Sequence, residues 1–413
     1  MSDSNQVMNF LNEVSSQYPK ATSLASGRPL DWNFSLDLMK EYQDIYCDFA
    51  ANLQSVPRVD IEKQLCQYGS TTGIINELLC HSLIKDEGIN CQPENILVTN
   101  GCQEALALLA LEFCKSQDDT LLVFEPSYIG FTGACSITKT HVESIPSQGF
   151  NVCFQSLTTT IERLLKQGKN PRALYINPDF SNPLGICLTN AERQQLLQVC
   201  HHYEIVILED NPYGQFYFSD SKPATIKSLD EYNLVYYIGS FAKTLSPGLR
   251  IGYVVCPTGS EQHYQALKAA KSMISVNTSQ LMQAVVGGFL IKHEYSLSMP
   301  LAELRQAYKT ARDIILSVLQ ERFADVPSIS WNSPDGGFFL VINLPFEFSQ
   351  QEVEECASTQ NVICMPVSFF TSEHNNYWNK AIRIAYSNVS GEKLREATHR
   401  LCCYILSRMS KPS

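Results

Sequence analysis

The sequence predicts an α/β fold, with a mostly parallel sheet in a large domain and a second, smaller α/β domain. Short runs of β-branched and apolar residues alternate with helix-like stretches through the middle of the chain, as crossover connections between parallel strands require. The last third differs, because it opens with a long helix-like stretch at residues 301–323. At 413 residues and 44% hydrophobic, the chain is long enough to bury two cores.

The expected strands of the large domain are short, apolar and followed by turns or helical periodicity. They fall at residues 96–99, 120–124, 173–176, 205–208, 234–238 and 251–255. After the long helix, the last third predicts a strand at 336–342 and a final helix from Ser390. This order of elements indicates parallel strands joined by helices, followed by a separate small domain.

The composition argues against several classes of function. A formal net charge of −11 disfavours a nucleic-acid or anionic-membrane partner. No run approaches the roughly 20 apolar residues that span a bilayer, and residues 1–6 do not resemble a signal peptide. The 15 cysteines are scattered without a C-x-x-C pair. This pattern favours free thiols in a reducing cytoplasm over disulfides or a metal site.

Lys243 is the strongest candidate for a catalytic residue. It follows an apolar run and is accompanied by Ser240 and Arg250. Partly apolar surroundings disfavour the ammonium ion, so we expect a lowered pKa and an amine that attacks carbonyl groups. Since the neighbouring hydroxyl and guanidinium suit a phosphate, the segment meets the needs of pyridoxal 5'-phosphate (PLP), which forms a Schiff base with lysine. The alternative is a surface lysine after a buried strand.

Two further expected strands end in polar residues. The run 205–213 carries Asp210 and Tyr213 at its end, and Asn182 lies in the turn after the strand at 173–176. Open parallel sheets bind ligands at the carboxyl ends of their strands. Asp210 can pair with a protonated pyridine nitrogen, Tyr213 can donate to the ring oxygen, and Asn182 can bond this oxygen and a carboxylate. Taken singly, Asp210 could cap a helix and Asn182 could be only a turn residue.

The segment 96–105 predicts a strand, a tight turn at Gly101 and the start of a helix. The N–H groups and the dipole at a helix start favour a bound anion, and glycine allows close backbone approach. Only one of the three glycines of a dinucleotide fingerprint is present, so a NAD site is not expected. With Ser240 and Arg250, this turn is the expected phosphate site.

Taken in order, these segments resemble the fold-type I PLP enzymes, and specifically the class I and II aminotransferases. The sequence is nearest to the branch of the 2-aminoadipate and kynurenine aminotransferases, with some likeness to a dihydroxyphenylglycine transaminase-like group. The resemblance covers the chain from about residue 25 onward. It rests on the runs Asn182-Pro-Leu-Gly185, Asp210 with Tyr213, Ser240-Phe-Ala-Lys243, Arg250-Ile-Gly252 and Ile382-Arg-Ile-Ala-Tyr386.

The resemblance implies a seven-stranded sheet and a particular division of the chain. Residues 51–295 would form the large PLP-binding domain and 296–413 the small C-terminal domain, to which the N-terminal segment 1–50 would contribute. Two positions depart from the family pattern: Leu184 stands where Thr is usual, and Ala242 where many relatives have Ser. Neither side chain is essential to the implied chemistry.

Further residues receive roles from the resemblance alone. Cys102 and Gln103 would contact the phosphate beside Gly101, and Tyr128 would stack on the pyridine ring. Tyr68 would reach the phosphate of a neighbouring subunit, which implies a homodimer with shared active sites. Without the resemblance, Tyr128 reads as a core aromatic and Tyr68 as part of a turn.

The substrate would meet a second group of residues. Arg383 would bind the substrate carboxylate through paired hydrogen bonds together with Asn182. Gly27 and Arg28 would edge the pocket, where Arg28 could meet an acidic or polar side chain or lie on the surface. Without the resemblance, Arg383 reads as an exposed salt-bridge arginine.

The implied activity is transamination between an L-amino acid and a 2-oxo acid through the Lys243 Schiff base. Lys243 would move the proton as general acid and base, and Asp210 would keep the ring nitrogen protonated. The alternatives are another PLP reaction on this scaffold (elimination, decarboxylation, cyclisation or oxidation), an aminotransferase-like effector domain of a transcription regulator, and a binding protein without PLP. The acidic composition disfavours the regulator.

Overall fold

The computed structural model describes residues 4–31, 34–147, 149–371 and 376–410. The strands are β1 (Thr22–Ser23), β2 (Ile96–Thr99), β3 (Asp119–Phe124), β4 (Val142–Ile145), β5 (Asn170–Ile176), β6 (Val206–Asp210), β7 (Val235–Ser240), β8 (Gly252–Val255), β9 (Ser330–Trp331), β10 (Phe339–Asn343), β11 (Val362–Ile363), β12 (Met365–Pro366) and β13 (Ala381–Ala385). The helices are α1 (Ser4–Gln17), α2 (Leu36–Gln54), α3 (Arg58–Leu65), α4 (Asn76–Glu87), α5 (Cys102–Phe113), α6 (Ile129–Thr138), α7 (Phe154–Lys166), α8 (Asn190–His202), α9 (Glu261–Ile274), α10 (Gln280–Lys292), α11 (Ala302–Phe323), α12 (Gln350–Gln360) and α13 (Gly391–Met409). None of these helices is long and apolar enough to cross a membrane.

A seven-stranded sheet with the order β2-β8-β7-β6-β5-β3-β4 confirms the predicted α/β fold. The strands pair in parallel except β8, which runs antiparallel to both β2 and β7. The sequence reading missed β4, whose Val142-Glu-Ser-Ile145 is short and half polar because it forms one edge of the sheet. Because β5, β6 and β7 are parallel neighbours, their carboxyl ends lie side by side at the same edge of the sheet.

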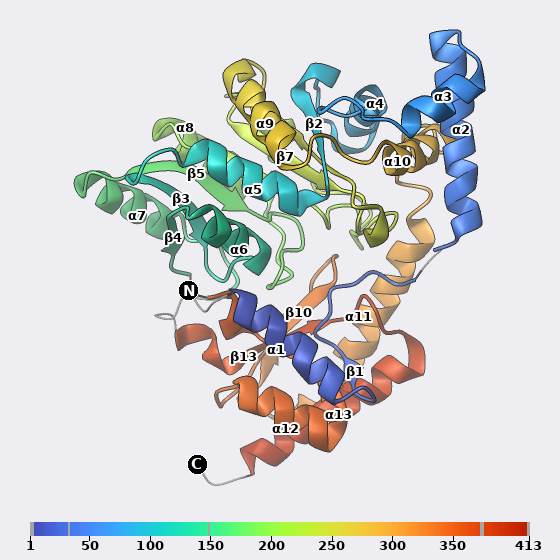
Figure 1. Ribbon diagram of the computed structural model, residues 1–413. Coiled ribbons are helices and arrows are strands. Elements are labelled where there is room, and N and C mark those ends of the chain that lie inside the picture. Colours follow the sequence, from blue (N-terminus) through green and yellow to red (C-terminus); the bar gives the residue numbers. More distant parts are fainter. Residues whose placement is uncertain (1–3, 32–33, 148, 372–375, 411–413) are drawn as a thin grey trace.

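Helices cover both faces of this sheet (Figure 1). Leu121 and Val123 of β3 point to the core shared with α5, α6 and α9, whereas Leu122 points to the core shared with α7 and α8. This alternation follows from the two-residue period of a strand. Because both faces are buried, the strands read as continuous apolar runs in the sequence.

The last third of the chain forms a four-stranded antiparallel sheet with the order β12-β13-β10-β9. The segment after α1 adds to it, because the Leu24 carbonyl oxygen accepts from Ala385 N of β13 at 2.7 Å. Just before, β1 pairs in parallel with β11 in a separate two-stranded sheet. Figure 1 shows α1 and β1 beside α12 and α13, far from α2 in space. This arrangement brings Gly27 and Arg28 to the edge of β10 and β13, where they face the larger sheet.

Helix α2 packs along α10 instead of joining the smaller sheet. Tyr42 of α2 and Phe289 of α10 meet edge to face at 5.5 Å between ring centroids. Gly288 permits this close approach, since a β-carbon there would overlap the Tyr42 carbonyl oxygen. The backbones of the two helices thus approach each other directly at this contact.

We expect Gly288→Ala to lower the free energy of unfolding by about 1–3 kcal/mol, because the added methyl group must push α2 and α10 apart. Urea unfolding followed by circular dichroism measures the change. Gly248→Ala is the matched control, since a β-carbon there meets only Ser246 Oγ at 3.7 Å. Equal unfolding midpoints for the two variants would contradict the close contact.

Candidate active site

A cavity of about 880 Å³ opens where the carboxyl ends of β5, β6 and β7 face the smaller sheet. It brings together side chains from the N-terminal segment, the strand ends of the large sheet and β13. Of the predicted site residues, it is lined by Gly27, Arg28, Cys102, Gln103, Tyr128, Asn182, Asp210, Tyr213, Ser240, Lys243, Arg250 and Arg383.

Lys243 follows β7 and lies partly buried in this cavity. Its Nζ donates to the Gly27 carbonyl oxygen at 2.8 Å, so a residue from the start of the chain holds it in place. Burial, together with the charges of Arg383 and Arg250, lowers the pKa of Lys243 to about 8. A neutral amine is therefore accessible near neutral pH, as nucleophilic chemistry requires.

Asp210 is the last residue of β6 and is buried. Its Oδ2 accepts a hydrogen bond from the Tyr175 hydroxyl at 2.7 Å, whereas its Oδ1 has no partner among the described residues. Burial raises the pKa of Asp210 to about 6, although the hydrogen bond from Tyr175 and the charge of Lys243 both act to lower it. The group is mostly ionised at pH 7, so it offers one free carboxylate oxygen to an N–H donor in the cavity.

The turn between β2 and α5 gathers groups that suit an anion. Gly101 has a φ of 75° and packs so closely on Arg250 that a β-carbon would meet the guanidinium. A β-carbon at Gly252 would lie 2.7 Å from Cys102 N. These glycines let the start of α5 approach Arg250, with Ser240 lining the same space. Helix N–H groups, a hydroxyl and a guanidinium are the donors that a phosphate prefers.

Cys102 and Gln103 use their side chains within the protein. Cys102 Sγ lies 3.3 Å from the Gly239 carbonyl oxygen, and burial raises the pKa of its thiol. Gln103 Nε2 donates to the Gly130 carbonyl oxygen at 2.6 Å, which ties α5 to the start of α6. Their backbone N–H groups lie in the first turn of α5, where an α-helix offers no internal acceptor, so they are free to donate to an anion.

Arg383 projects from β13 into a buried aromatic environment. Its guanidinium carbon lies 4.4 Å from the Phe339 ring centroid and 4.9 Å from that of Phe370. Its Nη1 donates to Asn182 Oδ1 at 2.6 Å, and burial lowers the pKa of Arg383 to about 10. The guanidinium stays charged at neutral pH, so it is a buried cation suited to a carboxylate.

Two tyrosines complete the walls of the cavity. Burial raises the pKa of Tyr128, which precedes α6, to about 12, so its phenol is neutral. Tyr213 packs edge to face on Phe338 and Phe339 at 5.3 and 5.6 Å, and burial raises the pKa of its phenol as well. Both phenols can donate hydrogen bonds at neutral pH.

Two predicted site residues do not line this cavity. Gly101 lies in the turn just before Cys102, which does line it. Tyr68 is the other. It is 84% exposed. Arg28 lines the cavity with an exposed side chain, so it stands at the rim.

Several residues in the cavity wall or directly behind it were missed by the sequence reading. Tyr175 carries the hydrogen bond to Asp210, and Asn177 Nδ2 donates to the Asp210 carbonyl oxygen at 2.5 Å. Both belong to the run that contains Asn182, so their place at the end of β5 was the available signal. Asn12 and Ser15 of α1 also line the cavity, and nothing in their local sequence indicates it.

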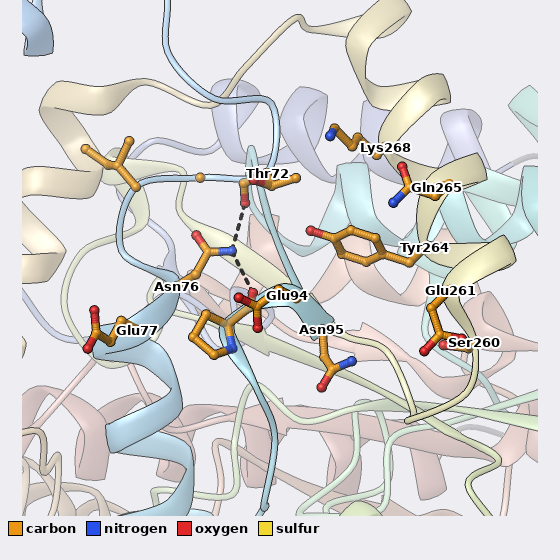
Figure 2. A pocket seen from close by; sticks show the side chains of 13 residues that line it. Thr72, Asn76, Glu77, Glu94, Asn95, Ser260, Glu261, Tyr264, Gln265 and Lys268 are labelled. Atoms are coloured by element: carbon orange, nitrogen blue, oxygen red, sulfur yellow. Dashed lines mark hydrogen bonds between the residues drawn. The ribbon is translucent and has the colours of Figure 1, made fainter.

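A second cavity, of about 550 Å³, lies between the 72–77 segment and α9 (Figure 2). In Figure 2, Asn76 points toward the backbone of Thr72 and Pro93, to which its Nδ2 donates at 3.3 Å in each case. None of the predicted site residues lines this cavity. We therefore assign the chemistry to the cavity that contains Lys243.

Comparison with known proteins identifies the family of this chain. The chain matches the family model described as aminotransferase class I and II over residues 48–401. It is 35% identical to (S)-3,5-dihydroxyphenylglycine transaminase of Amycolatopsis orientalis, covering 98% of this chain and 92% of the relative. Aromatic-amino-acid aminotransferase 1 of Thermococcus litoralis is 29% identical, covering 94% and 89%. The crystal structure of kynurenine aminotransferase from Pyrococcus horikoshii with PMP has a TM-score of 0.84 at 26% identity, covering 98% and 95%.

The fold is that of a fold-type I PLP enzyme. The chain belongs to the aminotransferase class I and II family, as the sequence motifs predicted. It is thus a PLP-dependent aminotransferase. The residues present fit this cofactor, because the free Asp210 Oδ1 supplies an acceptor for a ring N–H and the close contact of Gly101 with Arg250 forms an anion site.

We expect the rate at which the apoprotein captures PLP covalently to rise with pH and to level off above the Lys243 pKa of about 8. The rate should rise with pH because only the neutral amine attacks a carbonyl group, and below the pKa the amine is protonated. Stopped-flow absorbance on the apoprotein measures this profile. A rate that keeps rising toward pH 10, as for an ordinary lysine of pKa about 10.4, would contradict the assignment.

Proposed function

We propose that this aminotransferase uses Lys243 to move an amino group between an L-amino acid and a 2-oxo acid, with Asp210 as the partner of the PLP ring nitrogen. The observation that carries this proposal is the free, buried Oδ1 of Asp210 in the cavity that also holds the low-pKa amine of Lys243. When bound, PLP supplies a ring that accepts the electrons released at the substrate α-carbon.

The cofactor site that we propose spans three strand ends. Gly101, Cys102 and Gln103 would offer the backbone donors at the start of α5, with Ser240 and Arg250 closing the phosphate site. The ring would lie between Tyr128 and the residues at the end of β6. Tyr213 and Asn182 would donate to the ring oxygen, since both line the same cavity wall. These donors bind PLP at both ends, so its orientation is set before the substrate arrives.

Lys243 would first hold PLP and then act on the substrate proton. With a pKa of about 8, part of the Lys243 amine is neutral at physiological pH, so it can take the proton from the substrate α-carbon and deliver it to another atom. Asp210 would keep a proton on the ring nitrogen, because an ionised carboxylate stabilises an adjacent N–H cation. The buried surroundings exclude water and strengthen both effects.

Arg383 and Asn182 would bind the substrate α-carboxylate. Arg383 Nε is buried without a hydrogen-bond partner among the described residues, so it retains donor capacity. An amino acid and its oxo acid share this carboxylate, which explains one site for both substrates. Asn182 already accepts from Arg383 and thereby orients the guanidinium.

The pocket beyond this carboxylate site favours an aromatic or large apolar side chain. Ile129, Ile137, Phe339 and Phe370 line it, and two relatives are named for aromatic substrates. Gly27 and Arg28 would form its edge, with Arg28 free to meet an acidic group on the second substrate. Such an exchange belongs to amino-acid metabolism, within which we favour a biosynthetic step.

We propose that the enzyme is a homodimer in which the partner's Tyr68 completes the phosphate site. Tyr68 is 84% exposed, and Met273 and Ile274 at the end of α9 are 84% and 58% exposed. Gln280 Nε2 donates to the Gln67 carbonyl oxygen at 2.6 Å, which ties the segment of Tyr68 to the start of α10. Exposed apolar side chains on adjoining segments are typical of an interface.

The division of the chain and its location are also proposals. We assign residues 51–295 to a large PLP-binding domain and 296–413 to a small domain that takes up the N-terminal segment. The packing of α2 on α10 favours placing the boundary of that segment before Leu36 instead of at residue 50. A cytoplasmic location is supported by the 15 cysteines, all of which are free thiols.

Lys243→Ala tests the proposed function. We expect a folded protein that still binds PLP through Arg250 and Asp210 but loses at least about 10²–10⁴-fold in turnover, because the general acid and base is gone. Activity with an aromatic amino acid and 2-oxoglutarate gives the rate, and the absorbance of dialysed protein gives the bound PLP. Lys268→Ala, at an exposed lysine of the second cavity, is the control. Turnover that survives in Lys243→Ala would refute the assignment.

Tyr68→Phe tests the shared active site. Losing one hydrogen bond to a charged phosphate should weaken PLP binding by about 1.5–3 kcal/mol. Equilibrium dialysis measures this change, and analytical ultracentrifugation gives the oligomeric state. Tyr232→Phe is the control, since Tyr232 lines neither cavity. An active monomer at micromolar concentration would rule out the proposal.

A further inference from the structure

A buried ion pair lies behind the turn that carries the anion site. Lys271 of α9 is fully buried, and its Nζ lies 3.4 Å from Glu104 Oε2 of α5. The same Nζ donates to Ser275 Oγ at 3.0 Å. A fully buried lysine is rare, and burying an ion pair costs desolvation free energy. The presence of this pair behind the turn therefore needs an explanation.

Glu104 connects this lysine to the turn itself. It is the third residue of α5, and its Oε2 accepts from the backbone N–H of Asn100 at 2.7 Å. Asn100 Nδ2 lies 3.3 Å from both carboxylate oxygens. Thr99 Oγ1 donates to the Gly101 carbonyl oxygen at 2.9 Å, which restrains the next peptide. Side chains thus hold both peptides that lead into the first turn of α5.

The charge on Glu104 has to be balanced here. Burial alone would raise the pKa of Glu104, but hydrogen bonds from Ser275 and Asn100 and the charge of Lys271 keep that pKa below its ordinary value. Glu104 lies near the N-terminal end of α5, where we expect the anion to bind. An ionised carboxylate there would repel the anion. Lys271 offsets that charge, although burial lowers the pKa of Lys271 as well.

We propose that Glu104 and Lys271 are positioning residues for the cofactor phosphate: Glu104 fixes the Asn100–Gly101 turn, and Lys271 holds and neutralises Glu104. This inference rests on the proposed phosphate site. Neither side chain lines the cavity, so both act through the backbone N–H groups of α5. The affinity of those N–H groups for an anion depends on their direction, which the turn determines.

Two variants test this role by the binding of anions to the apoprotein. Glu104→Ala frees the Asn100 N–H, and Lys271→Met leaves the Glu104 charge unbalanced next to the anion. We expect each to raise the dissociation constant of PLP by about 10-fold or more, as the loss of a charge-assisted contact does. The inhibition constant of inorganic phosphate, measured as a competitor of PLP rebinding, should rise in parallel. Glu104→Gln keeps an acceptor for Asn100 and should retain more affinity than Glu104→Ala.

Lys222→Met is the matched control, because it breaks another buried ion pair, with Glu87, outside the cavity. It should lower stability and leave both anion constants unchanged. If Glu104→Ala does not fold, Lys271→Met and Glu104→Gln decide the matter. Unchanged constants in the folded variants, or an equal loss in Lys222→Met, would overturn the inference. If inorganic phosphate does not compete with PLP even in the native apoprotein, then the proposed phosphate site itself fails.

Discussion

The concentration of positive charge in one partly buried cavity is the constraint on which the rest of the site depends. Of the described residues that line it, Lys243, Arg250, Arg383 and Arg28 are cationic and Asp210 is the single carboxylate. Burial lowers the pKa of Lys243 and of Arg383, and the charges of Arg383 and Arg250 lower the pKa of Lys243 further. Such a cavity favours ligands that carry phosphate and carboxylate groups, which PLP and amino acids both supply.

The fold delivers these charges from distant parts of the chain. Lys243 is held by the Gly27 carbonyl oxygen, 216 residues away in sequence, and Arg383 reaches Asn182 across 201 residues. The parallel strands place Asp210 and the segment of Lys243 side by side, while β13 supplies Arg383 from the opposite wall. The site therefore exists only where the two sheets face each other across the cavity.

The sequence alone predicts those parts of the site that depend on local pattern. Lys243 and Asn182 follow short apolar strands and Asp210 ends one, so the continuous apolar run and its polar ending reveal them. The hydrogen bond from Tyr175 to Asp210 was not predictable, because Tyr175 reads as one more aromatic in a buried strand. The Glu104–Lys271 pair was not predictable either, because tertiary packing brings α5 and α9 together and neither residue belongs to a motif. Likewise β4 was missed, since an edge strand needs few apolar residues.

The most direct test of this account is the identity of the lysine that bonds to PLP. Borohydride reduction of the native holoenzyme fixes the cofactor to that lysine, and peptide mass spectrometry then locates it. The account predicts a pyridoxyl group on the peptide that contains Lys243, because this amine has the lowered pKa in the cavity with Asp210. A pyridoxyl group on any other lysine, or none in active enzyme, would contradict it.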